Sequence, residues 1–295
     1  MKFSTIIIRY GEIGLKSKQT RKFFERKLMQ NIKNVLKEFN AEYDNIKTEW
    51  GRLYVETTDK NVLPLLKLVF GIVSFSPAQV CNAEMKDISK LSTKIAKERI
   101  NEKDTFAVRA TRQGDHSFRS RDIGIQIGSN IQKITKAGVN LSDPTKEVFV
   151  EVRNKKAFVF VEKISGPCGI PQGIEGLAIG IFEKDRPFLA AAYLMSKRGC
   201  DIEAVTTEEL DMERVRYWLG DFKIHTVDKT KDIYKEAEKI AKQKNAKAIF
   251  NSDILTKDTL DNLVDFAKIS KKLTLPIFRP LIGFDEKKIK QLSSL

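Results

Sequence analysis

Residues 178–200, AIGIFEKDRPFLAAAYLMSKRGC, contain the pattern that decides the fold of the C-terminal part of the chain. An apolar run typical of a buried strand leads into a segment whose apolar residues recur at helical spacing. From residue 177 to residue 295, strand-like and helix-like segments of this kind alternate regularly. The alternation predicts an α/β domain with a doubly wound, Rossmann-like parallel sheet, in which ligands bind at the carboxyl ends of the strands.

The turn between this first strand and helix lacks the composition that phosphate binding usually requires. Glycines at such a turn let backbone N–H groups approach the phosphates of a nucleotide. Residues 183–188, EKDRPF, contain no glycine and carry four charges, and Pro187 has no backbone donor. Lys184 and Arg186 are the candidate cofactor-binding residues, because they would hold an anion in another way.

The part of the chain before residue 177 is more basic than the part after it. The net charge is +14, but residues 1–176 hold 31 Lys/Arg against 20 Asp/Glu, whereas residues 177–295 hold 22 against 19. A strongly basic soluble chain typically has an anionic partner, most often nucleic acid. We therefore expect the first part to contact a polyanion. The alternative is that its lysine-rich surfaces bind no polyanion.

Residues 1–76 predict a first α+β unit. An apolar strand at residues 3–8 precedes a glycine-containing loop and a long helix whose outer face is basic. Strands follow at GRLYVETT and GIVSFSPAQVCNA, on either side of a short helix.

Residues 77–165 predict a second α+β unit. Helices at about 88–101 and 121–137 stand before and after a strand TFAVRAT, and the strands EVFVEVRN and KAFVFVEKI form a hairpin. Val148, Val150 and Val152 alternate on one face, which predicts a sheet with one solvated side. The glycine- and proline-rich segment that follows predicts a linker at 166–176 before the last domain, 177–295.

Two basic stretches in this first part are candidates for nucleic-acid contact. In RYGEIGLKSKQTRKFF, Lys16 and Arg21 accompany a glycine-containing loop at the beginning of a helix, where phosphate binds readily; a purely structural turn is the alternative. Residues 108–124, VRATRQGDHSFRSRDIG, predict a loop whose guanidinium and aromatic groups suit an RNA backbone and unstacked bases. The alternative is a charged loop that is only solvated and binds no RNA. The candidates there are Arg109, Arg112, His116, Phe118 and Arg119.

Several other classes of protein are disfavoured. Cys81, Cys168 and Cys200 are widely spaced and the chain has two histidines, so we expect neither a disulfide framework nor a metal site. No apolar run approaches the roughly 20 residues of a membrane span, and a cytoplasmic protein is the expectation.

In chain order, the motifs RYGEIGLKS, VRATR, GPCGIPQGIEG, AAAYLMSKRG and IFRPLIGFDEKKI resemble the successive landmarks of the tRNA 4-thiouridine synthetase (tRNA sulfurtransferase, ThiI) family. The resemblance extends over essentially the whole chain. It implies an α+β N-terminal part, made of a ferredoxin-like domain and a THUMP domain that binds tRNA. A pyrophosphatase-loop domain that adenylates a uridine with ATP would follow. With that family in mind, we expect Gly166, Gly169 and Gln172 of the linker to contribute to RNA binding.

The chain departs from the family's pattern where the chemistry takes place. The family's SGGxDS turn falls on residues 183–188, where no position matches, and NSDILTKDT at 251–259 replaces a glycine- and serine-containing stretch. No residue aligns with the family's sulfur-transfer cysteine, and Cys168 and Cys200 are expected to be structural. We therefore predict a tRNA-binding protein with a degenerate pyrophosphatase loop, no catalytic residue and no cofactor.

Two other functions stay open at this stage. The chain would be an active ATP-dependent tRNA sulfurtransferase if Lys184 or Arg186 replaced the glycine-rich loop. It would be a structural subunit if its basic face met an acidic protein. Besides tRNA, the expected partners are a separate catalytic subunit and a second copy of the chain.

Overall fold

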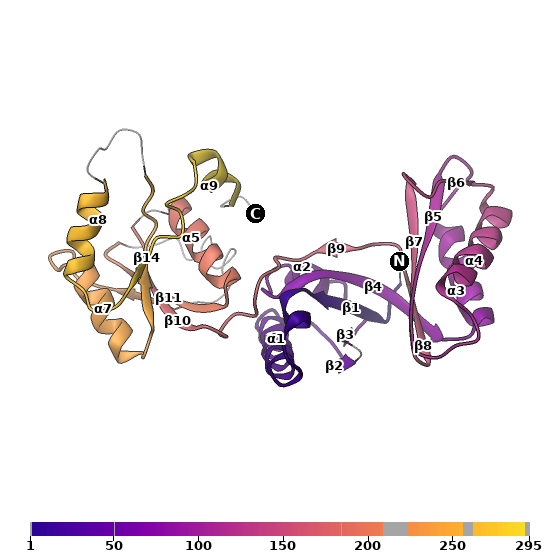
Figure 1. The fold of residues 1–295 in the computed structure, drawn as a ribbon, viewed down its shortest axis with the longest axis horizontal. Helices are drawn as coiled ribbons and strands as arrows, with labels where there is room; N and C mark the ends of the chain where they lie inside the picture. The colour runs from indigo at the N-terminus through magenta and orange to yellow at the C-terminus, as the bar shows by residue number, and fades with distance from the viewer. Residues whose placement is uncertain (1, 50, 184, 209–222, 256–261, 293–295) are drawn as a thin grey trace. The chain divides into compact units, whose positions relative to one another are not determined.

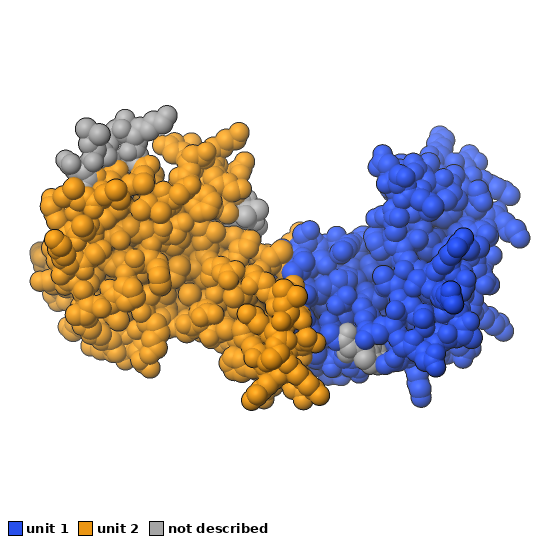
Figure 2. Space-filling model, in the orientation of Figure 1, with its two compact units in different colours: residues 1–10, 36–66, 73–166 blue, residues 11–35, 67–72, 167–295 orange. Residues whose placement is uncertain are grey.

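The structure is a computed structural model that describes residues 2–49, 51–183, 185–208, 223–255 and 262–292 (Figure 1). The chain divides into two compact units. Unit 1 comprises residues 1–10, 36–66 and 73–166, and unit 2 comprises residues 11–35, 67–72 and 167–295 (Figure 2). This division differs from the expected domain boundaries, which stay predictions.

Unit 1 is built on a nine-stranded sheet with the order β2-β3-β1-β4-β8-β7-β5-β6, and β9 pairs with β4. The strands β1 to β4 follow the βαββαβ chain order of a ferredoxin-like domain together with two helices, α1 (Lys18–Glu38) and α2 (Val62–Leu66). Most of α1, up to residue 35, is counted in unit 2. The strands are β1 Thr5–Tyr10, β2 Asn45–Glu49, β3 Arg52–Glu56, β4 Ile72–Asn82, β5 Thr105–Gln113, β6 Gly138–Val139, β7 Lys146–Arg153, β8 Lys156–Phe160 and β9 Ile164–Ser165.

The strand β2 has no counterpart in the predicted elements. Its sequence NIKTE buries only Ile46, and it lies at the edge of the sheet, so its residues show little apolar alternation. Pairing with β3, from Asn45 opposite Glu56 to Glu49 opposite Arg52, makes it a strand.

In the second half of unit 1, α3 (Met85–Arg99) and α4 (Ser120–Thr135) lie on one face of β5, β7 and β8 (Figure 1). The predicted hairpin is confirmed: β7 pairs antiparallel with β8, and the turn residue Asn154 has a φ of 46°. Val148, Val150 and Val152 are buried beneath the two helices, as their alternation predicts. The opposite face is not simply solvated, because Glu151 is only 5% exposed.

The predicted loop at 108–124 is mostly regular structure. β5 continues to Gln113 and α4 begins at Ser120, so only residues 114–119 connect the two. Arg109 and Arg112 therefore lie on a strand, because β5 pairs in parallel with β7 along its length up to Gln113. Sequence alternation ends earlier because this half of β5 buries few side chains.

Unit 2 contains a parallel sheet with the order β12-β11-β10-β13-β14, which confirms the predicted doubly wound fold. Helices α5 and α9 lie on one face of it, and α7 and α8 on the other (Figure 1). The expected helix at 209–219 falls outside the described residues. The elements are β10 Gly176–Ile181, α5 Asp185–Lys197, β11 Cys200–Thr206, β12 Ile224–Thr226, α7 Ile233–Gln243, β13 Ala248–Phe250, α8 Asn262–Lys271, β14 Ile277–Phe278 and α9 Glu286–Leu292; a short 3-10 helix, Glu12–Leu15, precedes α1.

The glycine-rich segment before β10 is packed rather than loose. Gly169 is buried with a φ of +83°, and a Cβ there would collide with the carbonyl oxygen of Lys197 at the end of α5. The N–H of Ile170 donates to that same carbonyl at 3.0 Å. Close approach of two backbones is the physical reason for glycine at this position.

Candidate functional site

The parallel sheet of unit 2 has its topological switch point between β10 and β13, where the strand order reverses. Doubly wound sheets bind their ligands at the carboxyl ends of such strands. Phe182 follows β10 there, and Asn251 follows β13. The side chains around these two residues therefore decide what this crevice accommodates.

An aromatic cluster packs beside this point. Phe188, in the first turn of α5, is fully buried, with its ring centroid 4.3 Å from that of Phe182 and 5.7 Å from that of Phe250. Gly180 lets the rings approach the sheet, because a Cβ there would lie 2.5 Å from Phe250 and 2.7 Å from Phe188. Phe188 occupies the last position of the expected phosphate-binding turn, so a core side chain stands where a hydroxyl group would face the ligand.

The backbone of this turn offers little to a triphosphate. Helix α5 begins at Asp185, so Pro187 lies within the first turn, where free N–H groups would otherwise point at an anion. Glu183, two residues before the first residue of the helix, is exposed. Lys184 lies outside the described residues, as does the side chain of Arg186. The described residues of this turn therefore provide no glycine-rich backbone that could surround the phosphates of a nucleoside triphosphate.

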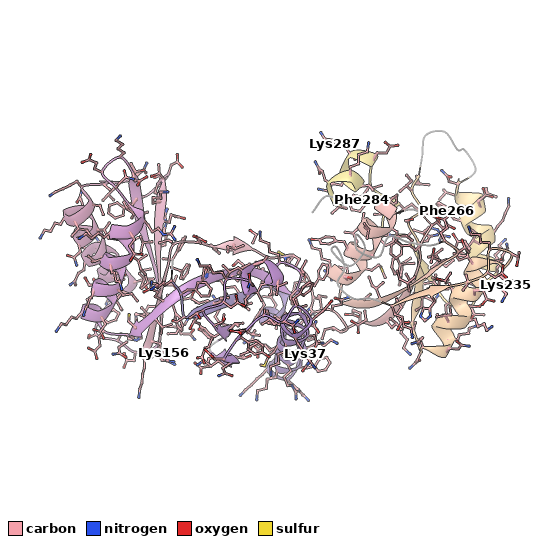
Figure 3. All side chains as sticks on the ribbon, turned by 180° about the vertical axis from the view of Figure 1, so that it is seen from behind. Lys37, Lys156, Lys235, Phe266, Phe284 and Lys287 are labelled. Carbon is pink, nitrogen blue, oxygen red and sulfur yellow. The ribbon has the colours of Figure 1, made fainter. Side chains whose placement is uncertain are left out.

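The loop after β13 forms a polar network of its own. The amide of Asn251, which is 2% exposed, donates to the hydroxyl of Tyr234 at 3.1 Å and to Asp253 at 2.5 Å. Arg279 donates to the same carboxylate at 3.0 Å, and its guanidinium lies 4.5 Å from the ring centroid of Phe266 on α8 (Figure 3). Burial raises the pKa of Tyr234 to about 12. These polar groups satisfy one another; the rest of the stretch, from residue 256, lies outside the described residues.

In unit 1, two of the predicted RNA-binding arginines lie on β5 but on opposite faces of the sheet, because Arg109 is aligned with Phe149 and Arg112 with Val152, which faces the helices. Arg109 donates to Glu147 at 2.7 Å and to the carbonyl of Leu141 at 2.8 Å, and its side chain is 40% exposed. Arg112 donates to the carbonyl of Gly114 at 2.6 Å. A guanidinium has five N–H donors, so both arginines keep donors for a further acceptor.

His116 joins Arg112 to the turn of the β7–β8 hairpin. Its Nε2 lies 2.6 Å from the carbonyl oxygen of Asn154 and its Nδ1 lies 3.3 Å from Arg112. Because a carbonyl only accepts, Nε2 carries the proton and Nδ1 accepts from the arginine. Phe118 lies against the imidazole, 5.3 Å between ring centroids, and Arg119 is exposed at the start of α4.

The remaining candidates, in the loop before α1 and in the glycine-rich segment, have partners within the protein. Arg21 donates to the carbonyls of Gly14, at 2.8 Å, and of Lys16, at 3.4 Å, so it closes the loop before α1. The side chain of Lys16 is exposed. In the glycine-rich segment, Gly169 is buried, and the carbonyl of Gln172 accepts from Asn31 at 2.9 Å. Gly166, in unit 1, donates its N–H to the carbonyl of Val73.

A second set of charged residues in unit 1 was missed from the sequence. Glu151, on the face of β7 opposite the three valines, contacts the guanidinium groups of Arg9, Arg52 and Arg153. They line a cavity of about 440 Å³ together with Arg109 and Lys163. The available signal in the sequence was a carboxylate within a strand of β-branched residues. Its arginine partners could not be identified, because two of them are far away in the sequence.

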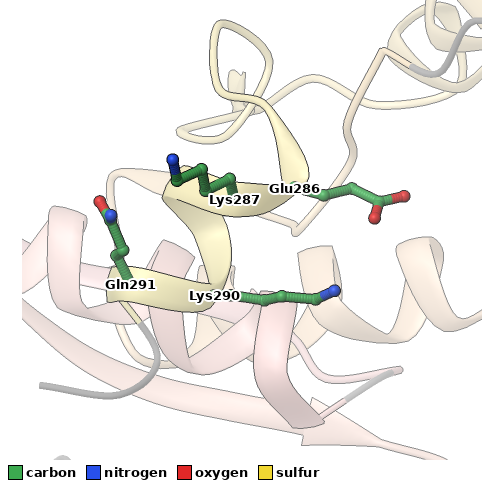
Figure 4. A pocket seen from close by; sticks show the side chains of 4 residues that line it. All are labelled: Glu286, Lys287, Lys290 and Gln291. Carbon is green, nitrogen blue, oxygen red and sulfur yellow. The ribbon is translucent and has the colours of Figure 1, made fainter.

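A further hollow in the described part of the chain lies in unit 2. On α9, Glu286, Lys287, Lys290 and Gln291 line a hollow, but their side chains point in different directions (Figure 4). Within the described ranges, no group of three or more His, Cys, Asp or Glu is placed to hold a metal ion. None of the described helices is both long and apolar enough to cross a membrane.

Family models match three parts of the chain. The ThiI ferredoxin-like domain matches residues 5–76, the THUMP domain residues 82–162, and the thiamine biosynthesis protein (ThiI) family residues 221–294. In unit 1, these ranges cover the strands that carry the arginines described above. In unit 2, the last range begins after α5.

Similar proteins cover nearly the whole chain. A probable tRNA sulfurtransferase of Methanosarcina acetivorans is 31% identical over 97% of this chain and 79% of its own length, and that of Thermococcus kodakarensis is 33% identical over 97% and 86%. The crystal structure of PH1313 from Pyrococcus horikoshii has a TM-score of 0.84 at 30% identity, covering 99% of this chain and 98% of that one. A 4-thiouridine synthetase–RNA complex with bound ATP has a TM-score of 0.81 at 26% identity, covering 99% and 84%. This chain therefore belongs to the tRNA sulfurtransferase (ThiI) family.

Proposed function

We propose that this protein binds tRNA through unit 1 and has lost the ATP-dependent chemistry of its family. The burial of Phe188 carries the second half of this proposal, because a core aromatic ring stands in the phosphate-binding turn. The first half is supported by the THUMP match and by the structural likeness to a synthetase that was crystallised with RNA. In this view the protein presents tRNA to a separate catalytic subunit.

The arginines of β5 have the chemistry that an RNA backbone requires. Arg109 and Arg112 are each held by carbonyl groups of unit 1, so their remaining donors have restricted orientations. Phosphate contacts of this kind release counterions, so the affinity falls as salt rises, with a slope that reports the number of phosphates neutralised. Phe118 and His116 add aromatic rings beside the guanidinium of Arg112.

Binding is tested by fluorescence anisotropy of labelled tRNA at several salt concentrations. We expect the Arg109→Ala/Arg112→Ala variant to bind more weakly and its salt slope to fall by roughly one for each phosphate that is no longer neutralised. Lys235→Ala is the matched control, since Lys235 is exposed on α7 in unit 2. Equal affinities of the double variant and the wild type would remove β5 from the interface. Equal binding of an unrelated acidic protein would favour a structural subunit instead.

The loss of chemistry is tested by calorimetric titration with ATP and by pyrophosphate release in the presence of tRNA. We expect neither nucleotide binding nor turnover. If thiolated uridine or pyrophosphate appears and disappears again in Lys184→Ala, the chain is an active sulfurtransferase with a different nucleotide site. Arg186→Ala serves the same purpose for the second cation of that turn.

A further inference from the structure

Glu151 is a buried carboxylate held by cations from three strands. Its Oε2 accepts from Arg9 of β1 at 3.0 Å. Its Oε1 accepts from Arg52 of β3 at 3.2 Å and from Arg153 of β7 at 2.6 Å. The carboxylate is 6% exposed, and the guanidinium groups of Arg9 and Arg153 are 13% and 12% exposed.

The charges in this cluster do not balance. Burial alone would raise the pKa of Glu151, but Arg9, Arg153 and Arg52 outweigh it, and the pKa lies below its usual range. One negative charge therefore faces three positive charges. Burying cations without a counter-charge is costly, so a set of this composition is typical of a place where a further anion binds.

The surroundings orient this excess positive charge toward open space. The four residues line the cavity of about 440 Å³, whose wall includes the stacked rings of Phe149 and Phe160, 5.1 Å apart. Arg9 lies over the ring of Phe160, 4.9 Å from its centroid, and also donates to Ser76 at 3.0 Å. Arg9 is thus held on three sides, which leaves its remaining donors little freedom.

We propose that Glu151 is a positioning residue: it does not touch RNA, but holds Arg9, Arg52 and Arg153 as one rigid set of phosphate donors. This inference rests on the proposed RNA binding of unit 1. Arginine side chains lose considerable conformational entropy when they are immobilised. A shared carboxylate that restrains all three in the folded protein reduces that loss on binding.

The variant Glu151→Gln separates positioning from simple electrostatics, because the two effects have opposite signs. The substitution removes a negative charge from a basic surface, so long-range attraction alone would strengthen tRNA binding. If Glu151 positions the arginines, affinity falls about tenfold or more, as expected when a charge-assisted hydrogen bond to phosphate is removed, and the salt slope becomes shallower. Glu56→Gln is the matched control: it removes the same charge from β3, where Glu56 pairs with Lys47.

Circular dichroism shows whether Glu151→Gln folds. If it does not fold, a second variant keeps the test decisive. Glu151→Asp retains the charge on a side chain one methylene shorter, which cannot reach all three arginines in the same way. We expect it to bind tRNA with an affinity between those of the wild type and the glutamine variant. Full wild-type affinity in Glu151→Asp, when the glutamine variant is unfolded, would overturn the positioning role.

The outcomes also distinguish this inference from the function on which it rests. If the wild type binds tRNA and folded Glu151→Gln binds equally well or more tightly, positioning is wrong and RNA binding stands. If the wild type binds no tRNA under conditions in which an active family member does, both are wrong. Weaker binding by the folded glutamine variant, with Glu56→Gln unchanged, supports positioning.

Discussion

Replacing Phe188 by alanine tests whether the turn at 183–188, where the family's phosphate-binding turn is expected, belongs to the hydrophobic core. The ring is 0% exposed and packs against Phe182 and Phe250. A buried phenylalanine removes about 200 Å² from water, which corresponds to about 5 kcal/mol at about 25 cal/mol per Å². Since alanine keeps only the Cβ, we expect the last domain to lose about 3–5 kcal/mol of stability.

Hydrogen exchange followed by mass spectrometry is the appropriate assay, because a chain with two units need not unfold in a single transition. Peptides from β10 and β13 report opening of the parallel sheet, and peptides from β5 and β7 are the internal reference. The expected loss corresponds to exchange that is faster by about two to three and a half powers of ten. Phe278→Ala is the control, since that side chain is 49% exposed on β14; we expect a loss of about 1 kcal/mol or less.

A change of only a few-fold in β10 and β13 for Phe188→Ala would refute the packing argument. The ring would then line an open crevice, and the lost-site interpretation of the turn would fall with it. If Phe188→Ala instead gained ATP binding while its sheet became less stable, packing and nucleotide binding would be shown to compete for the same space.

The remaining predictions concern the backbone contact before β10 and a buried phenol. Gly169→Ala should lower the melting temperature and weaken hydrogen-exchange protection around Lys197. The new Cβ would collide with the carbonyl of Lys197, and the φ of residue 169 is positive. Gly283→Ala is the control, because a Cβ there has nothing within 4 Å. Burial raises the pKa of Tyr54 to about 12 from 10.0, so the folded state stays protonated while the unfolded state ionises. The free energy of unfolding is therefore unaffected by Tyr54 ionisation below pH 10, and it falls by about 2–3 kcal/mol between pH 10 and 12. Tyr54→Phe should reduce this alkaline loss of stability, and at neutral pH the stability of the variant should be unchanged or higher, because the hydroxyl has no hydrogen-bond partner among the described atoms. Titration of tyrosinate absorbance measures the pKa, and urea unfolding measures the stability. An alkaline loss that is unchanged in the variant would contradict this prediction.

Local patterns were sufficient to predict most of the fold. Alternating valines in β7 and the regular strand–helix order after residue 177 depend on residues that are close in sequence, and both predictions are confirmed. β2 was missed because it buries one apolar residue, and the predicted strand TFAVRAT ended before Arg112 because β5 is partly exposed there. Each error lies where pairing with a neighbouring strand, rather than side-chain periodicity, maintains the element.

The sequence by itself determined the order of most of the elements, the basic character of the first part and the absence of glycine from the turn at 183–188. Only the tertiary structure decided what individual polar side chains do. Arg9 and Glu151 are separated by 142 positions, and no local pattern indicates that they meet. Arg21 donates to the carbonyls of its own loop, which no sequence pattern indicated, and its contact with phosphate stays a prediction. A side chain's partner depends on which distant strands lie side by side, and the hydrophobic core that aligns those strands forms only when the whole chain folds.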